Sequence, residues 1–276
     1  MAHAHRLAIV GCGTMGETIV GGLLRAGLYA PGEVIATARR PEVALAVRQR
    51  HGVATTLDNL AACSGAEVVL LTVKPQRVHK VLQLPGLREA LAGKTVISIA
   101  AGVTLSQLAG WLPDSAVIRA MPNTPCQITE GMTVVARGPG VGDPAVAAAV
   151  RLFETVGRCV EVEDKLMDAV TSLGASGPAF VYVMIEAMAD GGVMMGLPRN
   201  LALEIAAQVF QGAARMVLQT SRHPAALKDQ VTTPAGCTIA GILTMEDGRI
   251  RSVLARTIQE AARVAGELGR DVAADR

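Results

Sequence analysis

The chain has 276 residues, which is enough for one large domain or two smaller ones with a substantial core. Half of the residues are apolar but only 2% are aromatic, so aliphatic side chains and glycine must build the interior. The net charge of +2 comes from dispersed lysines and arginines, which argues against a nucleic-acid-binding protein.

The cysteines and histidines exclude further classes of site. The five cysteines are widely spaced and form no C-x-x-C pair: Cys12, Cys63, Cys126, Cys159 and Cys237. This pattern predicts neither a disulfide framework nor a zinc site, and it is typical of a reducing cytoplasm. The histidines lack metal-ligand spacing, so we expect no metal site. We also expect no signal peptide, and no run of about eighteen apolar residues marks a membrane span.

The first predicted element is a strand that leads into a glycine-rich turn. Leu7–Val10 is apolar, and Gly11-Cys-Gly-Thr-Met-Gly16 precedes a helix that stops at Gly27. In this strand–turn–helix setting, G-x-G-x-x-G predicts a dinucleotide site in which Gly13 lets a pyrophosphate meet the backbone. The alternative is a glycine-rich turn without a ligand.

Two arginines follow the second predicted strand, Glu33–Ala38. An NAD site carries an acidic residue at this position, whereas this chain has Arg39 and Arg40. Because a guanidinium group matches a 2′-phosphate, the pair predicts a preference for NADP(H) over NAD(H). The alternative is that both arginines are solvated and only precede the helix from Pro41.

Strands and helices continue to alternate up to about residue 163. Further strands are predicted near Val53 and over residues 67–73, 95–99, 116–120, 131–137 and 158–162, with helices over 42–51, 57–63, 76–91, 104–111 and 143–156. In the loop Met121-Pro-Asn-Thr-Pro125, Asn123 or Thr124 could reach a ligand. The alternation predicts an α/β fold whose first domain, residues 1–163, is a Rossmann-type doubly wound, mostly parallel sheet.

Residues 164–276 are predicted to form an all-α domain. Apolar residues recur at helical spacing from Phe180 to Met188, after an interruption at residues 174–178, and residues 199–220 are apolar nearly all round. Three glycine positions are expected to end the first of these helices: Gly191, Gly192 and Gly196-Leu-Pro198. This much apolar helix predicts a dimerisation domain, and the alternative is a monomeric bundle packed on the sheet.

The segment Gln230–Ala240 is predicted to start another helix. Potential caps and first-turn residues are Thr232, Thr233 and Pro234. Gly236 lets a ligand approach the backbone, and free N–H groups at Cys237, Thr238 and Ile239 favour a carboxylate. Taken alone, the segment favours a capped helix start without a ligand.

Four motifs are specific enough to indicate a family. They are Met121-Pro-Asn-Thr-Pro125, Ala175-Ser-Gly-Pro-Ala-Phe180, Ala189-Asp-Gly-Gly-Val193 with Gly196-Leu-Pro-Arg199, and the run from His223-Pro to Ile239. With these motifs, the chain resembles pyrroline-5-carboxylate reductase nearly end to end. The resemblance implies NADPH-dependent reduction of 1-pyrroline-5-carboxylate to L-proline, the last step of proline biosynthesis, by hydride transfer to a cyclic imine, with NADH as the weaker coenzyme.

The resemblance also implies roles for individual residues. The cofactor would be bound by Val10, Gly11, Cys12, Gly13, Thr14, Met15, Arg39, Arg40, Asn59, Val73, Lys74, Pro75, Ala100 and Ala101. The substrate would be bound by Ser176, Gln230, Gly236, Cys237 and Thr238, and Thr238 would be the catalytic residue that hydrogen-bonds the ring nitrogen. The family's helical domains interlock as homodimers, which implies a homodimer and allows a decamer, a ring of dimers.

Four positions depart from the usual pattern of that family. Thr233 stands where serine is common, Ala235 where glycine is common, Cys237 where a small or hydroxyl residue is common, and Phe180 where tyrosine is common. No general acid is apparent, so solvent or a substrate that is already protonated would supply the proton. Asp164 and Lys165, near the predicted domain junction, could assist or be solvated charges.

Two other functions are compatible with the same pattern of elements. A β-hydroxyacid dehydrogenase combines a similar sheet with helices, but it needs a lysine in the first long helix, and Gly174–Met188 has none. A non-catalytic NADP(H)-sensing protein would hold the cofactor without oxidising it. The loop that contains Thr238 argues against this second alternative.

Overall fold

The computed structural model describes residues 5–274 of the chain, with side chains placed up to residue 267. It consists of two compact units. The first unit contains the chain up to Ser176 together with the residues from Glu260 onward, and the second contains Gly177–Gln259. The domain boundary after residue 163 stays a prediction.

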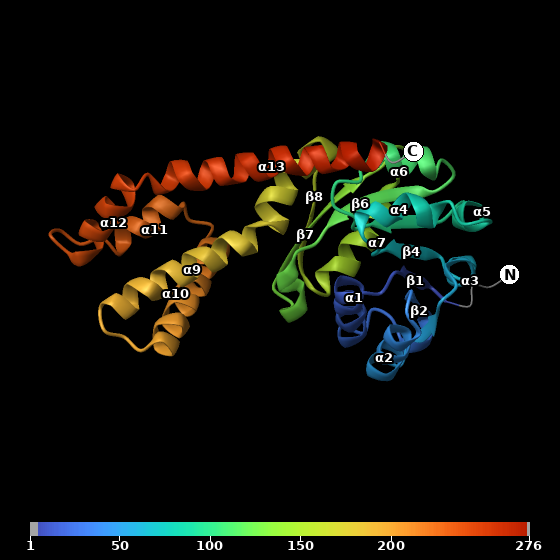
Figure 1. Ribbon diagram of the computed structural model, residues 1–276, viewed down its shortest axis with the longest axis horizontal. Coiled ribbons are helices and arrows are strands. Elements are labelled where there is room, and N and C mark those ends of the chain that lie inside the picture. The colour runs from blue at the N-terminus through green and yellow to red at the C-terminus, as the bar shows by residue number, and fades with distance from the viewer. Residues whose placement is uncertain (1–4, 275–276) are drawn as a thin grey trace. The chain divides into compact units, whose positions relative to one another are not determined.

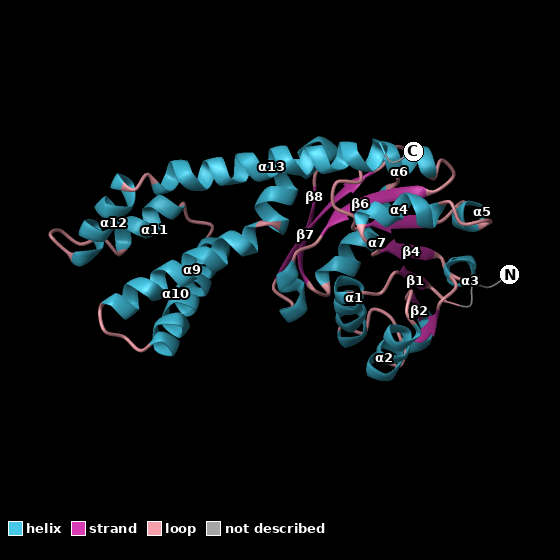
Figure 2. Ribbon diagram, in the orientation of Figure 1, coloured by secondary structure: helices cyan, strands magenta, loops and turns pink. Residues whose placement is uncertain are grey.

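The first unit is built on one eight-stranded sheet (Figures 1 and 2). Its strands are β1 (Leu7–Val10), β2 (Val34–Thr37), β3 (Ala54–Thr56), β4 (Val68–Leu71), β5 (Thr95–Ser98), β6 (Ala116–Met121), β7 (Gly131–Arg137) and β8 (Gly157–Glu161). They are ordered β3-β2-β1-β4-β5-β6-β7-β8, and all neighbours are parallel except β6 and β7. The predicted α/β fold with a doubly wound, mostly parallel sheet is therefore confirmed.

Helices cover both faces of this sheet. They are α1 (Thr14–Arg25), α2 (Pro41–His51), α3 (Asn59–Ser64), α4 (Pro75–Leu82), α5 (Leu87–Leu91), α6 (Leu105–Trp111) and α7 (Asp143–Glu154). Ile9 of β1 packs with α1, α2 and α7, whereas Val10 faces the core formed with α3, α4, α5 and α6. Successive residues of a strand point to opposite faces, so a strand covered on both sides must be apolar throughout.

The predicted helix over residues 76–91 is wrong, because the chain forms α4 and α5 instead. The break contains Pro85 and Gly86, and Gly86 has a φ of 75°. This left-handed conformation suits glycine and cannot continue a right-handed helix. The apolar periodicity runs through the break, since both helices face the same core.

Three short helical elements precede the second unit. They are η3 (Asp164–Leu166), α8 (Met167–Val170) and η4 (Thr171–Ala175), a π-helical turn. The predicted interruption at residues 174–178 thus takes the form of a widened turn that leads into the next helix. Two other 3₁₀ turns, η1 (Pro31–Glu33) and η2 (Thr124–Ile128), lie in the loops before β2 and after β6.

The second unit contains α9 (Gly177–Met194), α10 (Arg199–Thr220), α11 (Pro224–Gln230), α12 (Cys237–Asp247) and the first part of α13 (Ile250–Ala274). The expectation that Gly191 and Gly192 end α9 is wrong, because the helix continues to Met194. A side chain at Gly192 would come within 3.2 Å of the Cβ of Ala202, so this glycine allows α9 and α10 to pack closely. The helix ends before Gly196, whose φ is 93°, as predicted.

Large apolar side chains on the helices of the second unit are exposed in a single chain. They include Val183, Met188, Leu201, Ile205, Val209, Met216, Leu218 and Leu243. Residues 164–194 and 199–220 are long and apolar enough to cross a membrane, by length and composition alone. Only 11% of the most apolar stretch of each is buried in the single chain. The sequence predicts no membrane span, because no run of about eighteen apolar residues marks one. Helices covered by another subunit show the same exposure.

Candidate functional site

The loop between β1 and α1 has the geometry of a nucleotide-binding turn. Gly11 has a φ of 87°, and a Cβ added to it would overlap the side chain of Val73 and approach its backbone N at 3.2 Å. A Cβ on Gly16 would lie 2.8 Å from Thr72 Oγ1. Gly13 has open space around it, apart from the carbonyl of Gly11 at 4.0 Å. The first and third glycines therefore permit close packing, and the second leaves the turn accessible.

The hydrogen bonds of this loop determine which N–H groups can meet a ligand. Gly11 N donates to Thr37 Oγ1 at 3.0 Å, and Cys12 N donates to Thr37 O at 2.6 Å. Gly13 N donates to Gly11 O at 2.7 Å. The first N–H groups of a helix lack intrahelical partners, so an anion would meet those of Thr14 and Met15.

Other predicted cofactor residues also lie at the carboxyl edge of the sheet. Arg39 and Arg40 follow β2 and are exposed, and Arg40 Nε lies 3.4 Å from Glu42 Oε1. The remaining residues follow β3, β4 and β5: Asn59, Val73, Lys74, Pro75, Ala100 and Ala101. Ligands bind outside the carboxyl ends of such strands, at the point where the strand order reverses, which here lies between β1 and β4.

Val10 and Cys12 are buried in the core beneath the glycine loop. Their side chains pack against the sheet, so only their backbone atoms are available to a cofactor. Burial raises the pKa of the Cys12 thiol to about 12. This cysteine is therefore an unreactive packing residue, and its place in the motif carries no redox chemistry.

The predicted substrate loop lies in the second unit, between α11 and α12. Gln230 ends α11 and is exposed, and Gly236 is the N-cap of α12, which begins at Cys237. A Cβ on Gly236 would overlap Thr233 Oγ1, so a larger residue here would require the Thr233 side chain to move. Thr238 is at the second position of the helix, where its backbone N–H has no intrahelical partner.

The predicted capping of this helix is wrong. Gly236 itself is the N-cap, and Thr232 Oγ1 donates to Lys228 O at 2.8 Å instead of to the helix start. Pro234 lies in the preceding turn and not in the first turn of α12. Because no neighbouring side chain occupies the cap position, the first N–H groups of α12 remain available to an anion.

Ser176, the remaining predicted substrate residue, belongs to the first unit. It directly follows η4 and its backbone N donates to Thr171 O at 3.0 Å. Its side chain is half-buried. The predicted substrate residues are thus distributed over both units.

The family of the chain follows from its similarity to known proteins. Residues 164–268 match the family model described as pyrroline-5-carboxylate reductase dimerisation, and residues 6–102 match that described as NADP oxidoreductase, coenzyme F420-dependent. The pyrroline-5-carboxylate reductase of Schizosaccharomyces pombe is 41% identical over 95% of this chain and 98% of its own length. That of Synechocystis is 42% identical over 96% and 98%. The chain belongs to the pyrroline-5-carboxylate reductase family.

A solved structure gives the same assignment. The pyrroline-5-carboxylate reductase of Coxiella burnetii is 31% identical, with a TM-score of 0.90 over 96% of this chain and 98% of its own. The predicted resemblance to this reductase family, and with it the assignment as an oxidoreductase, is confirmed.

In this member of the family, Arg119 is a buried charge that the sequence analysis misses. It lies in the middle of β6, is 2% exposed, and its Nη1 donates to Asp164 Oδ1 at 3.1 Å. Its Nη2 lies 3.7 Å from Asp168 Oδ1. Among residues 5–267, whose side chains the structure places, its Nε and Nη2 have no hydrogen-bond partner. The sequence does contain a signal for this ion pair, namely a single arginine within an apolar strand. A charge buried in such a strand requires a partner of opposite charge.

The two charged residues that were expected to assist the reaction have other partners. Asp164 pairs with Arg119, and Lys165 Nζ lies 2.5 Å from Glu163 Oε2. Asp164 therefore serves first to compensate a buried guanidinium group. Within the described residues, no group of three or more histidine, cysteine or acidic residues could hold a metal ion.

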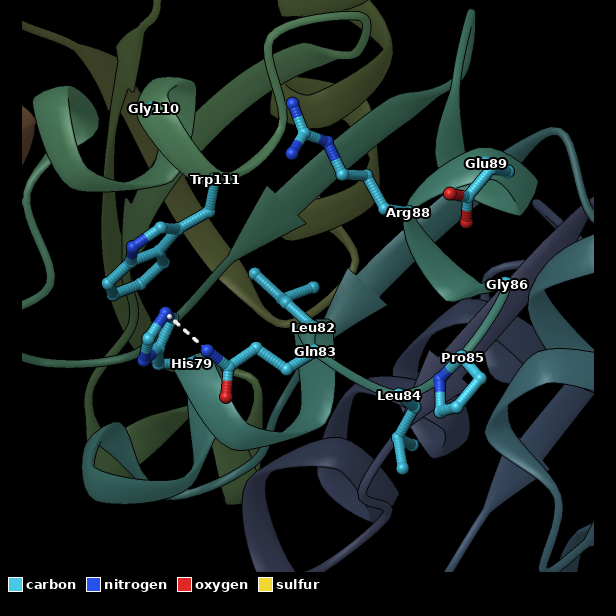
Figure 3. Close-up of a pocket in the computed structure, with 10 residues that line it drawn as sticks. All are labelled: His79, Leu82, Gln83, Leu84, Pro85, Gly86, Arg88, Glu89, Gly110 and Trp111. Atoms are coloured by element: carbon cyan, nitrogen blue, oxygen red, sulfur yellow. Dashed lines mark hydrogen bonds between the residues drawn. The ribbon is translucent and has the colours of Figure 1, made fainter. Parts of the chain in front are cut away.

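A separate hollow of 360 Å³ lies among α4, α5 and α6 of this reductase (Figure 3). His79 stacks on Trp111 with ring centroids 4.7 Å apart, and its Nε2 hydrogen-bonds Gln83 at 3.2 Å. The hollow includes the end of α4, whereas the cofactor loops lie where the parallel strands end and the helices begin. Its lining residues include none of the predicted site residues.

Proposed function

We propose that this chain reduces 1-pyrroline-5-carboxylate to L-proline with NADPH. The observation that carries the proposal is identity of 41% and 42% to proteins of this name, extending over nearly the whole length of each chain. The two matching family models cover the glycine loop and the segment Gln230–Ala240. The reaction thus agrees with the two sites that the sequence predicts independently.

The residues around the glycine loop fit NADPH. When bound, the cofactor supplies a hydride from C4 of its nicotinamide ring. The open turn at Gly13 and the N–H groups of Thr14 and Met15 would hold its pyrophosphate. The loops after β3, β4 and β5 would contribute Asn59, Val73, Lys74, Pro75, Ala100 and Ala101. These residues position the cofactor and exclude water, and none of them is required as an acid or base.

Arg39 and Arg40 are proposed to bind the 2′-phosphate of the adenosine. Both side chains are exposed at the end of β2, where the ribose of a dinucleotide lies in this fold. The ion pair between Arg40 and Glu42 is exposed and weak, so it can be exchanged for a phosphate. NADH, which lacks that phosphate, would bind less tightly.

The substrate carboxylate is proposed to bind the N–H groups of Cys237 and Thr238. The N–H of Gly236, which the resemblance also implies, already donates to Thr233 O at 3.1 Å, so Gly236 would contribute only the close approach of its backbone. Thr238 Oγ would then hydrogen-bond the ring nitrogen, and Gln230 and Ser176 would complete the contacts. An imine with a protonated nitrogen is strongly electrophilic, so the main task of the protein is to hold two reactants at attack distance. Solvent or the protonated substrate would supply the proton, because no general acid is apparent in the sequence and Asp164 pairs with the buried Arg119.

The exposed apolar helices of the second unit support a homodimer, and the free cysteines support a location in the cytoplasm. A dimer would cover the large side chains of α9, α10 and α12 that a single chain exposes. The five free cysteines are compatible with a reducing compartment. A decamer built as a ring of dimers is a further possibility of the same family.

The test is a direct spectrophotometric assay of the wild type and the Thr238→Ala variant. NADPH absorbance should fall on addition of 1-pyrroline-5-carboxylate, with L-proline as the product. The Thr238→Ala variant should lose at least about tenfold in kcat/KM, the equivalent of one lost hydrogen bond to a charged group. Cofactor binding without turnover would refute the proposal and support a sensing protein.

A further inference from the structure

The side-chain amide of Asn123, just after β6, forms hydrogen bonds with two backbone groups. It is only 9% exposed, its Nδ2 donates to Gly174 O at 3.0 Å, and its Oδ1 accepts from Met132 N at 2.9 Å. From the sequence, either this side chain or that of Thr124 could reach a ligand. Instead, Asn123 ties the loop after β6 to η4.

Gly174 O needs a hydrogen-bond donor from outside its own helix because residue 178 is proline. In an α-helix, the carbonyl of Gly174 would accept from the N–H of residue 178, which proline lacks, and the proline ring would crowd that carbonyl. The chain widens here into a π-helical turn, in which Ser176 N donates to Thr171 O, five residues earlier. Asn123 supplies the donor that Pro178 cannot.

Arg119 holds the other end of the same segment. Its guanidinium group contacts Asp164 at 3.1 Å and Asp168 at 3.7 Å, and both residues precede η4. Arg119 and Asn123 are four residues apart, the first in β6 and the second just after it. Two side chains from this part of the sheet unit therefore hold residues 164–176 in place, and Ser176 is the first residue beyond the held turn.

We propose that Asn123 is a positioning residue for the reductase reaction, which fixes the direction of the Ser176 hydroxyl by holding the π-helical turn 171–175. The inference rests on the proposed function, in which Ser176 contacts the substrate. Asn123 itself touches neither substrate nor cofactor. π-Helical turns occur frequently at functional sites, and this one would orient a polar side chain that an ordinary helical turn would direct elsewhere.

A double-mutant cycle tests whether Asn123 acts through Ser176. Asn123→Ala should lower kcat by about 10²-fold, as expected for a misplaced contact, while KM for NADPH stays unchanged. Adding Asn123→Ala to Ser176→Ala should cost nothing further, since the hydroxyl is already gone. Gln127→Ala, an exposed change in the same loop, should leave kcat unchanged. A wild-type kcat for Ser176→Ala, or multiplicative losses in the double variant, would overturn the proposal.

Pro178→Ala separates positioning from simple stability. The restored N–H can bond Gly174 O, so amide exchange in residues 171–176 of Asn123→Ala/Pro178→Ala should be as slow as in the wild type. The melting temperature should recover only in part, because Met132 N still lacks the acceptor that Asn123 Oδ1 provides. An α-helical turn would rotate Ser176 by about 100°, so kcat should stay low. Recovery of kcat together with stability would show that Asn123 is only structural. An inactive wild type would refute the proposed function instead, and the exchange measurements would still report whether Asn123 holds the turn.

Discussion

Ala235 carries backbone strain in the proposed substrate loop. Its φ is 56°, a left-handed conformation that glycine adopts freely and that costs alanine about 1 kcal/mol. The resemblance to the reductase family implies that glycine is common at this position. The structure gives the physical reason, since the turn before Gly236 requires a positive φ.

Ala235→Gly should therefore stabilise the folded chain by about 0.5–1 kcal/mol, despite the larger entropy of glycine in the unfolded state. The measurement is urea unfolding at a fixed protein concentration. Ala240→Gly, inside α12, is the matched control and should destabilise by about 1 kcal/mol. If Ala235→Gly is destabilising too, the loop does not require the left-handed conformation.

Arg39 and Arg40 together should set the preference for NADPH. Replacing both with alanine removes charge-assisted hydrogen bonds to the 2′-phosphate, so KM for NADPH should rise at least about tenfold while KM for NADH changes little. Arg48→Ala, at the far end of α2, removes a similar charge and should affect neither. Equal use of NADPH and NADH by the wild type would contradict the role of the pair.

At the scale of elements, β7 and β8 depend on a pair of glycines. Gly131 and Gly157 are partners in the parallel ladder, and Gly157 has a φ of 149°. A Cβ on Gly157 would overlap the backbone N and O of Gly131. The contact is between backbones, so no side chain can move aside to relieve it.

Gly157→Ala should cost about 3 kcal/mol or more, because backbone strain and overlap add. Gly140→Ala is a graded control, since Gly140 also has a positive φ, of 74°, but a Cβ there would meet nothing within 4 Å. Its cost should be only about 1 kcal/mol. Equal losses in thermal or urea unfolding would show that the contact with Gly131 is unimportant.

The ion pairs of β7 and β8 predict a pH dependence of stability. Hydrogen bonding to Arg137 holds the pKa of Glu161 below its ordinary value of 4.5, against the opposing effect of desolvation. A carboxyl group whose pKa is lower in the folded state stabilises the fold above its unfolded pKa. That contribution is lost as the pH falls through the folded value.

The free energy of unfolding should therefore decrease below about pH 4.5, and Glu161→Gln should make that decrease shallower. Urea unfolding at a series of pH values measures the slope. If the free energy of unfolding of Glu161→Gln depends on pH as steeply as that of the wild type, this carboxyl group does not contribute to the pH dependence.

The sequence predicts the sheet well because each strand is an apolar run with covered faces. It predicts the glycine turn after β1 and the loops that follow the strands because glycine spacing and strand ends are local signals. It fails where partners are distant or where neighbours compete: the apolar stripe hides the break at Gly86, and Thr232 bonds Lys228 in place of a cap. The link between Arg119 and Asp164 joins residues 45 positions apart, a pairing that no spacing rule identifies.

At the scale of the whole molecule, we expect a partner subunit to cover the exposed helices of the second unit. Val209 of α10 is 50% exposed in the single chain, and Val209→Glu would place an unpaired charge in the proposed interface. We expect light scattering after gel filtration to show dissociation of the dimer. Leu45, on α2 of the first unit, is 55% exposed, and the Leu45→Glu variant should remain dimeric. A dimeric Val209→Glu would exclude this face of α10 from the interface.

The central claim is that this chain delivers a hydride from the nucleotide to the imine carbon of a ring acid. The most direct measurement is to supply NADPH deuterated at C4 on the transferred face, with 1-pyrroline-5-carboxylate, and to analyse the product by mass spectrometry and NMR. The account predicts L-proline with one deuterium on the ring carbon that was double-bonded to nitrogen. Unlabelled proline, or no proline while the protein binds the cofactor, would contradict it.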